Sequence, residues 1–103
     1  MEQFYSLDVT SNEFQIPEIP VPPGSNKLNL SLTHWVGEDL DLDLEVSYDY
    51  GKTWVYGGGG KGAISAEPGI EFHLTYNLPI THVKGTFSSD ATVNSTIKIS
   101  AGT

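Results

Sequence analysis

The sequence predicts an all-β protein built as a single antiparallel β-sandwich, either immunoglobulin-like or jelly-roll, with an extended Pro-rich N-terminal arm. Apolar residues recur at every second position through most of the chain, which is the spacing of half-buried strands rather than of helices. Turn residues separate these alternating segments at short intervals. The chain has 103 residues, enough for one domain with one thin core. Counting strands does not separate the two topologies.

Seven strands follow from this alternation. Leu28, Leu30 and Leu32 share one face of an early segment, and Ile97 and Ile99 share one face of the last. Side chains on such faces are expected to form the core. The predicted strands cover residues 4–9, 27–35, 40–48, 53–56, 70–76, 81–87 and 92–100.

The segment FQIPEIPVPPG, residues 14–24, breaks the pattern. It contains four of the six prolines: Pro17, Pro20, Pro22 and Pro23. Because proline fixes φ and removes a backbone donor, the segment is predicted to run extended rather than to pair inside a sheet. It either lies along its own domain as an edge cover or crosses to a neighbouring subunit, where a stiff segment loses little entropy.

This segment sets the predicted boundary between two parts of the chain. Residues 1–27 form an N-terminal strand and Pro-rich arm, and residues 28–103 form the β-sandwich domain. The arm is expected to add few core positions, because it has few alternating apolar residues. Its four prolines are candidate contacts with a partner.

The tract GGGGKG, residues 57–62, is interpreted as a flexible loop between strands. A phosphate-binding loop needs Gly, four residues and then Gly-Lys-Ser/Thr, but here another Gly follows Lys61 and Val55 stands at the first Gly position. Phosphate binding is therefore not expected. The tip of the loop is a further candidate partner contact. It consists of Gly58, Gly59 and Gly60.

The stretch SYDYGKTW, residues 47–54, is predicted to form a hairpin turn. Asp49 is placed to accept hydrogen bonds from backbone N–H groups further along the chain, and Gly51 can adopt the left-handed conformation that closes such a turn. The hydroxyls of Ser47 and Thr53 flank it, and Trp54 can cover it with an apolar face. These five residues are the predicted structural turn motif.

The same stretch matches the pattern Ser-x-Asp-x-Gly-x-Thr-Trp and so resembles the Asp-box (BNR-like) motif of sialidases and related propellers, which also lies on a hairpin turn away from the catalytic pocket. The resemblance covers these eight residues, in one copy. Sialidases repeat the box in each blade and need an arginine triad, whereas all five basic residues here are lysines. Sialidase activity is therefore excluded.

The segment GEDLDLDLEV, residues 37–46, carries an acidic row on the face opposite its leucines. The row consists of Asp39, Asp41, Asp43 and Glu45. Its members are about 6.6 Å apart along the strand, and one straight strand cannot converge the roughly six to eight oxygens that Ca²⁺ needs. We interpret the row as a solvated face that resists aggregation, with Lys84 or Lys98 as possible partners from a neighbouring strand.

No arrangement of residues predicts catalysis, a metal site or a cofactor. His34, His73 and His82 are not at metal-ligand spacing, and His73 is expected beside Glu71 on the polar face of its strand. No Ser-His-Asp spacing is present, and the absence of Cys closes the thiol route. The chain is predicted not to be an enzyme.

The charge of the chain excludes two classes of partner. Thirteen acidic against five basic side chains give a net charge of −8, so a nucleic-acid duplex or an anionic bilayer would repel the chain at long range. We expect neither nucleic acid nor membrane as a partner. The lack of Cys suits folding in a reducing cytoplasm.

In general character, and in the phrase LEVSYDYGKTW followed by glycines, the chain resembles small tailed-phage proteins that cover capsids as decoration or cement proteins. Such proteins are short β-sandwiches or jelly rolls, often oligomeric, with an extended terminus that grips neighbours. The resemblance implies a non-enzymatic virion structural protein, made in the host cytoplasm and located on the capsid exterior. It implies the major capsid protein and further copies of the chain as partners, with a trimer favoured.

A carbohydrate-binding or adhesive module of the tail-fibre or baseplate type is the alternative. Sugar faces stack on exposed aromatic rings, and the candidate rings are Trp35, Tyr50 and Tyr56. Exposure of Trp35 and Tyr50 together would favour this alternative, and burial of both would oppose it.

Overall fold

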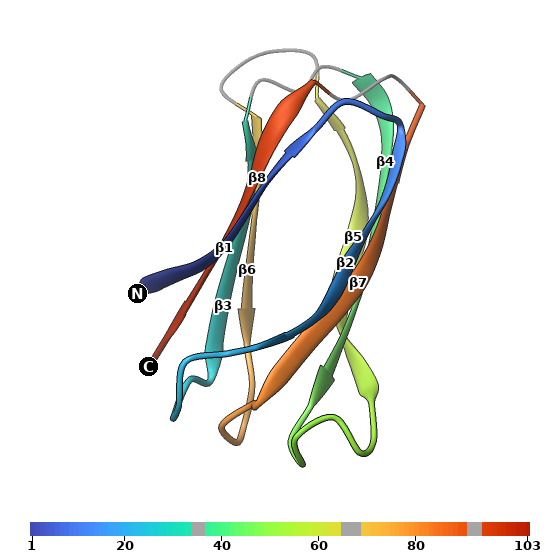
Figure 1. Ribbon diagram of the computed structural model, residues 1–103. Helices are drawn as coiled ribbons and strands as arrows, with labels where there is room; N and C mark the ends of the chain where they lie inside the picture. Colours follow the sequence, from blue (N-terminus) through green and yellow to red (C-terminus); the bar gives the residue numbers. More distant parts are fainter. Residues whose placement is uncertain (34–36, 65–68, 91–93) are drawn as a thin grey trace.

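The structure is a computed structural model that describes residues 1–33, 37–64, 69–90 and 94–103. The described residues form eight strands and no helix, and the strands build two antiparallel four-stranded sheets that face each other (Figure 1). The predicted all-β sandwich is therefore confirmed. In chain order the strands are β1 (Glu2–Val9), β2 (Glu13–Pro20), β3 (Lys27–Thr33), β4 (Gly37–Ser47), β5 (Val55–Ile64), β6 (Gly69–Thr75), β7 (His82–Ser89) and β8 (Ser95–Gly102).

The topology is that of a jelly roll. The first sheet has the order β1-β8-β3-β6 and the second sheet the order β2-β7-β4-β5. Successive strands alternate between the two sheets, and among the described strands only β4 and β5 follow each other within one sheet. Eight strands wound in this way distinguish the jelly roll from the immunoglobulin-like alternative.

The core lies between the sheets and follows the two-residue period of the sequence. Each fully buried aliphatic side chain contributes about 1.5 to 3 kcal/mol through removal of apolar area from water, so the alternating positions dominate the stability of the sandwich. The buried apolar residues are Val9, Ile16, Val21, Leu28, Leu30, Leu32, Leu42, Leu44, Val46, Ile80, Val83, Phe87, Ile97, Ile99 and Ala101.

The Pro-rich segment differs from the prediction, because much of it pairs in a sheet. Residues 13–20 form β2, an edge strand that is hydrogen-bonded to β7. Proline is tolerated there because an edge strand has one side without ladder bonds. The register shifts between Ile16 and Ile19, where Pro17 and Glu18 together stand opposite Lys84, so one extra residue forms a β-bulge. In this single chain the segment lies along its own domain, paired with β7.

The N-terminal region also adds more to the core than expected. Val9, Ile16 and Val21 are buried in the main apolar cluster, and β1 pairs with β8 while β2 pairs with β7. The expectation that this region holds few core positions was therefore wrong. Because its two strands belong to different sheets, the expected division at residue 27 does not separate two structural units in the described chain.

The Gly-rich tract was also predicted incorrectly, because it is strand rather than loop. Residues 55–64 form β5, which pairs with β4, and Gly57 is the extra residue at a register shift. A Cβ on Gly59 would lie 2.0 Å from the carbonyl oxygen of Leu42. The glycines therefore let β5 lie closer to β4 than residues with side chains would allow.

Candidate functional site

Three connections lie at the lower end of the sandwich in Figure 1. They are residues 21–26, 48–54 and 76–81, and we call this end the turn end. Backbone hydrogen bonds tie them together: Val21 N donates to Thr81 O at 2.9 Å, and Ile80 N donates to Ser25 O at 2.8 Å. Thr81 N donates to Ser47 O at 2.8 Å. The turn end is therefore a braced surface rather than three independent loops.

The turn between β4 and β5 is held by its own side chains. The buried Ser47 hydroxyl accepts hydrogen bonds from the N–H groups of Asp49 at 3.2 Å and Gly51 at 2.8 Å, and it donates to Asp49 Oδ1 at 2.7 Å. The Asp49 carboxylate also accepts from the backbone N–H of Thr53 at 2.9 Å and from the Thr53 hydroxyl at 2.5 Å. Side chains within seven residues of one another thus tie the turn to the end of β4.

These hydrogen bonds favour the charged form of Asp49. The Thr53 hydroxyl has the largest effect, followed by the Thr53 N–H and the Ser47 hydroxyl, and together they lower the pKa of Asp49 from 3.8 to about 2. The carboxylate is therefore ionised throughout the neutral and mildly acidic range. It acts as a fixed acceptor in the turn.

Tyr50 is held in an unfavourable backbone conformation. Its φ is 62° and that of Gly51 is 87°, which are the φ signs of a type I′ hairpin turn, where Asn-Gly is the preferred pair. A tyrosine in the left-handed region costs about 1 to 2 kcal/mol. The Tyr50 N–H donates to Thr81 Oγ1 at 2.9 Å, and the Thr81 hydroxyl donates onward to Ser47 O at 3.2 Å. This connection fixes the position of the strained residue.

Burial of the Tyr50 side chain contributes little stability to offset this strain. It is 78% exposed, and its ring meets the His82 ring edge-on, with centroids 6.4 Å apart and an interplanar angle of 74°. His82 Nδ1 lies 3.2 Å from Thr81 Oγ1. An exposed phenol ring is thus placed beside an imidazole and a hydroxyl.

A hollow of about 420 Å³ lies beside Tyr50 at the turn end. Its walls are mainly apolar and rigid, while a hydroxyl and an imidazole supply the side-chain polar groups. We call it the Tyr50 hollow. Besides Tyr50, its lining includes Pro20, Pro23, Pro79, Ile80, Thr81 and His82. A preformed, mostly apolar concavity with a few polar groups is typical of ligand-binding sites.

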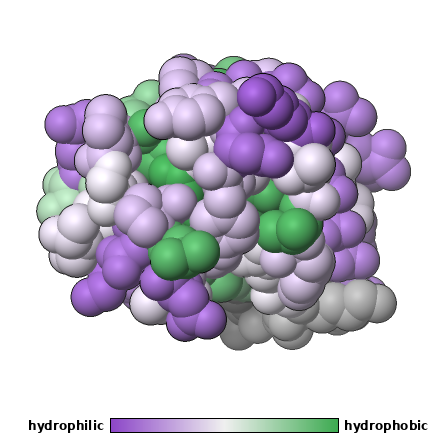
Figure 2. All heavy atoms as spheres, turned by 90° about the horizontal axis from the view of Figure 1, so that it is seen from below, coloured by the Kyte–Doolittle hydropathy of each residue, from purple (hydrophilic) through white to green (hydrophobic). Residues whose placement is uncertain are grey.

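Figure 2 views the molecule from this end. Several separate apolar areas lie among polar ones, rather than one continuous apolar patch. Such a mixed surface suits a partner or ligand that presents both polar and apolar groups.

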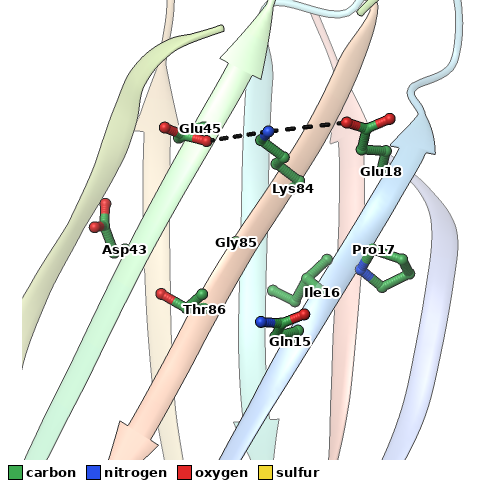
Figure 3. A pocket seen from close by; sticks show the side chains of 9 residues that line it. All are labelled: Gln15, Ile16, Pro17, Glu18, Asp43, Glu45, Lys84, Gly85 and Thr86. Carbon is green, nitrogen blue, oxygen red and sulfur yellow. Dashed lines mark ion pairs between the residues drawn. The ribbon is translucent and has the colours of Figure 1, made fainter.

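A second depression lies on the outer face of the second sheet, over β7 and the bulge of β2 (Figure 3). Lys84 Nζ lies 3.5 Å from Glu45 Oε2 and 3.8 Å from Glu18 Oε1, and 4.4 Å from the centroid of the Trp54 ring. Pairs this exposed contribute at most about 1 kcal/mol each, so they orient Lys84 more than they stabilise the fold. Glu45 has the lysine partner that the acidic row was expected to find.

The rest of the acidic row is exposed. Asp39, Asp41 and Asp43 all face solvent, on the side of β4 opposite its buried leucines. The row therefore charges the outer face of the second sheet. Among the described residues, no group of three or more His, Asp or Glu side chains is arranged to hold a metal ion.

The structure brings together some of the predicted partner-binding residues and separates others. Pro20 and Pro23 line the Tyr50 hollow, whereas Pro17 borders the depression around Lys84. Pro22 is half-buried, and its carbonyl accepts the Ser25 hydroxyl at 2.7 Å. The predicted glycine tip lies in β5 instead of a loop. It comprises Gly58, Gly59 and Gly60.

The three aromatic residues predicted as candidate sugar-binding rings differ in their positions. Tyr50 borders the hollow, whereas Tyr56 is 72% exposed on β5 and does not line it. Trp35 lies outside the described residues, as does His34. His73 lies beside Glu71 as expected, with His73 Nε2 at 3.4 Å from Glu71 Oε2.

The sequence interpretation missed several residues of the hollow. Thr81 and His82 fall in a predicted strand, and His82 was also weighed as a metal ligand. Pro79 carried no prediction. The turn signal Asn-Leu-Pro between two alternating segments could have indicated a loop there. It carried no sign that this loop packs against Tyr50, which lies 31 residues earlier than Thr81.

The sequence matches no protein-family model and no curated protein. Among solved structures, the chain is similar to a protein named PirA, with a TM-score of 0.50 and 10% identity over 95% of this chain and 92% of that chain. This similarity concerns the fold alone.

Two further solved structures have lower TM-scores, too low to support a functional inference. The Anabaena sensory rhodopsin transducer has a TM-score of 0.41 and 16% identity over 94% of this chain and 86% of that chain. TmCBM61, in complex with β-1,4-galactotriose, has a TM-score of 0.40 and 16% identity over 92% of this chain and 64% of that chain. None of the described residues forms a helix long and apolar enough to cross a membrane.

Proposed function

We propose that this chain is a non-enzymatic binding module that attaches to a larger surface through its turn end, and that the surface is the exterior of a viral capsid. On this proposal it acts as a decoration or cement protein. The observation that carries the proposal is Tyr50, an exposed ring on a strained backbone beside a preformed hollow.

The strained backbone of Tyr50 supports a binding role because the side chain does not stabilise the fold in compensation. Asn at this position would adopt the left-handed conformation at lower cost, and the 78% exposed ring adds little to the core. Residues kept in strained conformations cluster at ligand-binding sites, where the strain is part of the function. The proposal explains why a tyrosine is present where asparagine would fold better.

The remaining surface suits a module that covers a capsid. A braced turn end with proline walls loses little conformational entropy when it docks. The acidic outer face of the second sheet keeps the exposed side solvated and disfavours self-association through that face. Many copies, each binding weakly, stabilise a capsid by acting together.

On this proposal a phage encodes the chain, and co-sedimentation with purified heads of that phage tests the function. The wild-type chain should sediment with expanded heads in a saturable manner, and Tyr50→Asn should reduce binding at least about tenfold through loss of a central aromatic contact. Tyr56→Asn removes a similarly exposed tyrosine outside the hollow and serves as the matched control. Absence of wild-type binding to both expanded and unexpanded heads would contradict the capsid role.

A carbohydrate-binding module is the second candidate, favoured by the same exposed ring. A pyranose ring could stack on Tyr50 while the Thr81 hydroxyl and the His82 imidazole hydrogen-bond to its hydroxyls. Binding on a glycan array that Tyr50→Asn abolishes, without binding to heads, would select this function over the first. An array without any bound glycan would exclude it.

A further inference from the structure

Among the described residues, the two sheets have four edge strands, and three of them are irregular. The pairing of β1 shifts between Gln3 and Tyr5, and β5 has two register shifts and four successive glycines. The pairing of β2 shifts at its bulge, and Pro17 and Pro20 remove backbone donors from this strand. Bulges and prolines are the features by which proteins keep edge strands from pairing with other chains.

The fourth edge strand, β6, lacks these features. It pairs with β3 in unbroken register from Lys27 opposite Thr75 to Thr33 opposite Gly69. Its sequence GIEFHLT contains no proline and no lysine. Its other edge has no strand partner within the described chain. A regular, unprotected edge strand is a template for pairing with a further strand.

The side chains of β6 are complementary to a second copy of the same strand. Glu71 and His73 flank Phe72 symmetrically and lie exposed on the outer face, 3.4 Å apart between His73 Nε2 and Glu71 Oε2. In an antiparallel pair centred on Phe72, Glu71 of each copy stands opposite the partner's His73. An imidazole N–H that faces a carboxylate across two strands can donate a hydrogen bond to it, and such polar cross-strand pairs stabilise a sheet, whereas like charges directly opposite destabilise it.

We propose that β6 pairs with β6 of a second copy of this chain, antiparallel and with Phe72 opposite Phe72, so that two first sheets join into one continuous sheet. The two-fold arrangement gives a closed dimer, because each β6 has one free edge. It replaces the trimer that the sequence resemblance implies. The proposal stands independently of the capsid function, because β6 lies outside the Tyr50 hollow.

A second copy is the best-matched occupant of this edge. The same strand supplies an acid and an imidazole at mirrored positions, so both cross-strand pairs form at once. A centre on Phe72 is also compatible with either hydrogen-bonding phase of the strand, because antiparallel pairs alternate between the two kinds of position. A foreign strand would have to present this same pattern.

Sedimentation equilibrium of the purified chain, combined with charge exchange, tests the proposal. The wild-type chain should form dimers, and Glu71→Lys should raise the dimer dissociation constant about tenfold or more, because both symmetric pairs lose their complementarity. The double variant Glu71→Lys/His73→Glu exchanges the two roles and should restore dimers. Glu2→Lys makes the same charge change on the other edge strand of the first sheet and should leave the constant unchanged.

Thermal unfolding measured alongside should show that all variants stay folded, since both exchanged side chains are exposed. A wild-type chain that is monomeric up to about 1 mM, the weak limit of measurable association, would overturn the proposal. So would a trimer, or equal effects of Glu71→Lys and Glu2→Lys.

Oxidation of engineered cysteines tests the register, because the chain contains no Cys of its own. Glu71→Cys mixed with His73→Cys should form a disulfide-linked heterodimer, since residues directly opposite lie within the Cα range of about 4.4 to 6.8 Å that a disulfide spans. Each variant alone should cross-link much less. Equal cross-linking of the two separate variants would contradict pairing centred on Phe72.

Discussion

Tyr50 is a residue at which stability and binding should oppose each other. Replacing it with Asn gives the Asn-Gly pair that type I′ turns prefer and removes a strained tyrosine. We expect Tyr50→Asn to raise the free energy of unfolding by about 1 kcal/mol, less the small loss of the ring contact with His82. Urea denaturation followed by tryptophan fluorescence measures this change.

The control for this prediction is Tyr56→Asn, which removes another exposed tyrosine from a strand. Asn is less favourable than Tyr in a strand, so this variant should be neutral or slightly destabilised. A Tyr50→Asn variant that loses 1 kcal/mol or more would mean that the ring stabilises the turn end, and the strain argument for binding would fail.

Asp49 should make the turn sensitive to strong acid. Its folded pKa of about 2 lies below the ordinary value of 3.8, so its ionised form stabilises the fold. This contribution is fully present above the unfolded value and is lost as the pH falls through the folded one. Asp49→Asn should therefore melt at a lower temperature than wild type at pH 5, and the difference should shrink between pH 4 and about pH 2.

Thermal melts at several pH values between 5 and 2 check this expectation. A difference between wild type and Asp49→Asn that stays constant over that range would show that the charge of Asp49 plays no part. The exposed Asp41→Asn change is the matched control, because Asp41 lies on β4, the strand that leads into this turn, without such hydrogen bonds among the described contacts.

For single residues, the sequence predicts interactions between near neighbours in the chain, but it does not predict interactions between distant residues. The groups that hold the turn, Ser47, Asp49 and Thr53, lie within seven positions, so their chemistry and spacing suffice to suggest their hydrogen bonds. The Tyr50 hollow depends on a hydrogen bond from the Tyr50 N–H to the Thr81 hydroxyl, and these residues are 31 positions apart in the chain. No local pattern carries that information.

The glycines of β5 provide a test of how closely the edge strand packs. A Cβ at Gly59 would lie 2.0 Å from Leu42 O, whereas a Cβ at Gly60 meets nothing closer than a Phe72 ring carbon at 3.6 Å. Gly59→Ala should therefore destabilise the fold by about 1 to 3 kcal/mol through overpacking against backbone.

Gly60→Ala, on the same strand, should be neutral or stabilise by up to about 1 kcal/mol, because alanine lowers the entropy of the unfolded chain. Chemical denaturation of both variants measures the contrast. Equal effects would show that β5 does not lie against β4 as the structure has it.

The sequence does not predict β2 and β5 as strands, and the physical reason is the same for both. Prolines in β2 and glycines in β5 are depleted from central strands, so both segments were predicted as an arm and a loop. Both strands lie at sheet edges, where a missing donor or a missing side chain is tolerated. Strands with regular alternation, such as β3, were accessible because their apolar side chains mark the buried face.

Removal of residues 1–24 should abolish the fold rather than weaken a contact with a partner. The deletion takes away β1, β2 and three buried side chains, Val9, Ile16 and Val21. At about 1.5 to 3 kcal/mol each, these side chains alone contribute as much as the total stability of many small domains. The truncated chain should show no cooperative melt by circular dichroism.

Retention of a cooperative melt near the wild-type temperature would show that the first two strands are dispensable. The double replacement Glu2→Gln and Glu13→Gln alters exposed side chains of the same segment and is the control. It should stay within about 0.5 kcal/mol of wild type, as surface substitutions usually do.

The architecture as a whole was predictable only in part. Period-two burial sets the class, because each sheet needs one apolar face. It says nothing about which strands become neighbours, and the jelly-roll order depends on contacts between segments far apart in the chain, such as the Thr96 hydroxyl that donates to Asp8 Oδ1 across 88 residues.

The pairing of β1 with β8 also governs the order of events on the ribosome. The first sheet has only its β3–β6 ladder until β8 emerges, because β8 is the strand that joins β1 to β3. Nascent β1 therefore stays without its ladder for most of translation, and non-local closures of this kind are slow. The unpaired early strands are therefore open to self-association until synthesis has passed the last strand.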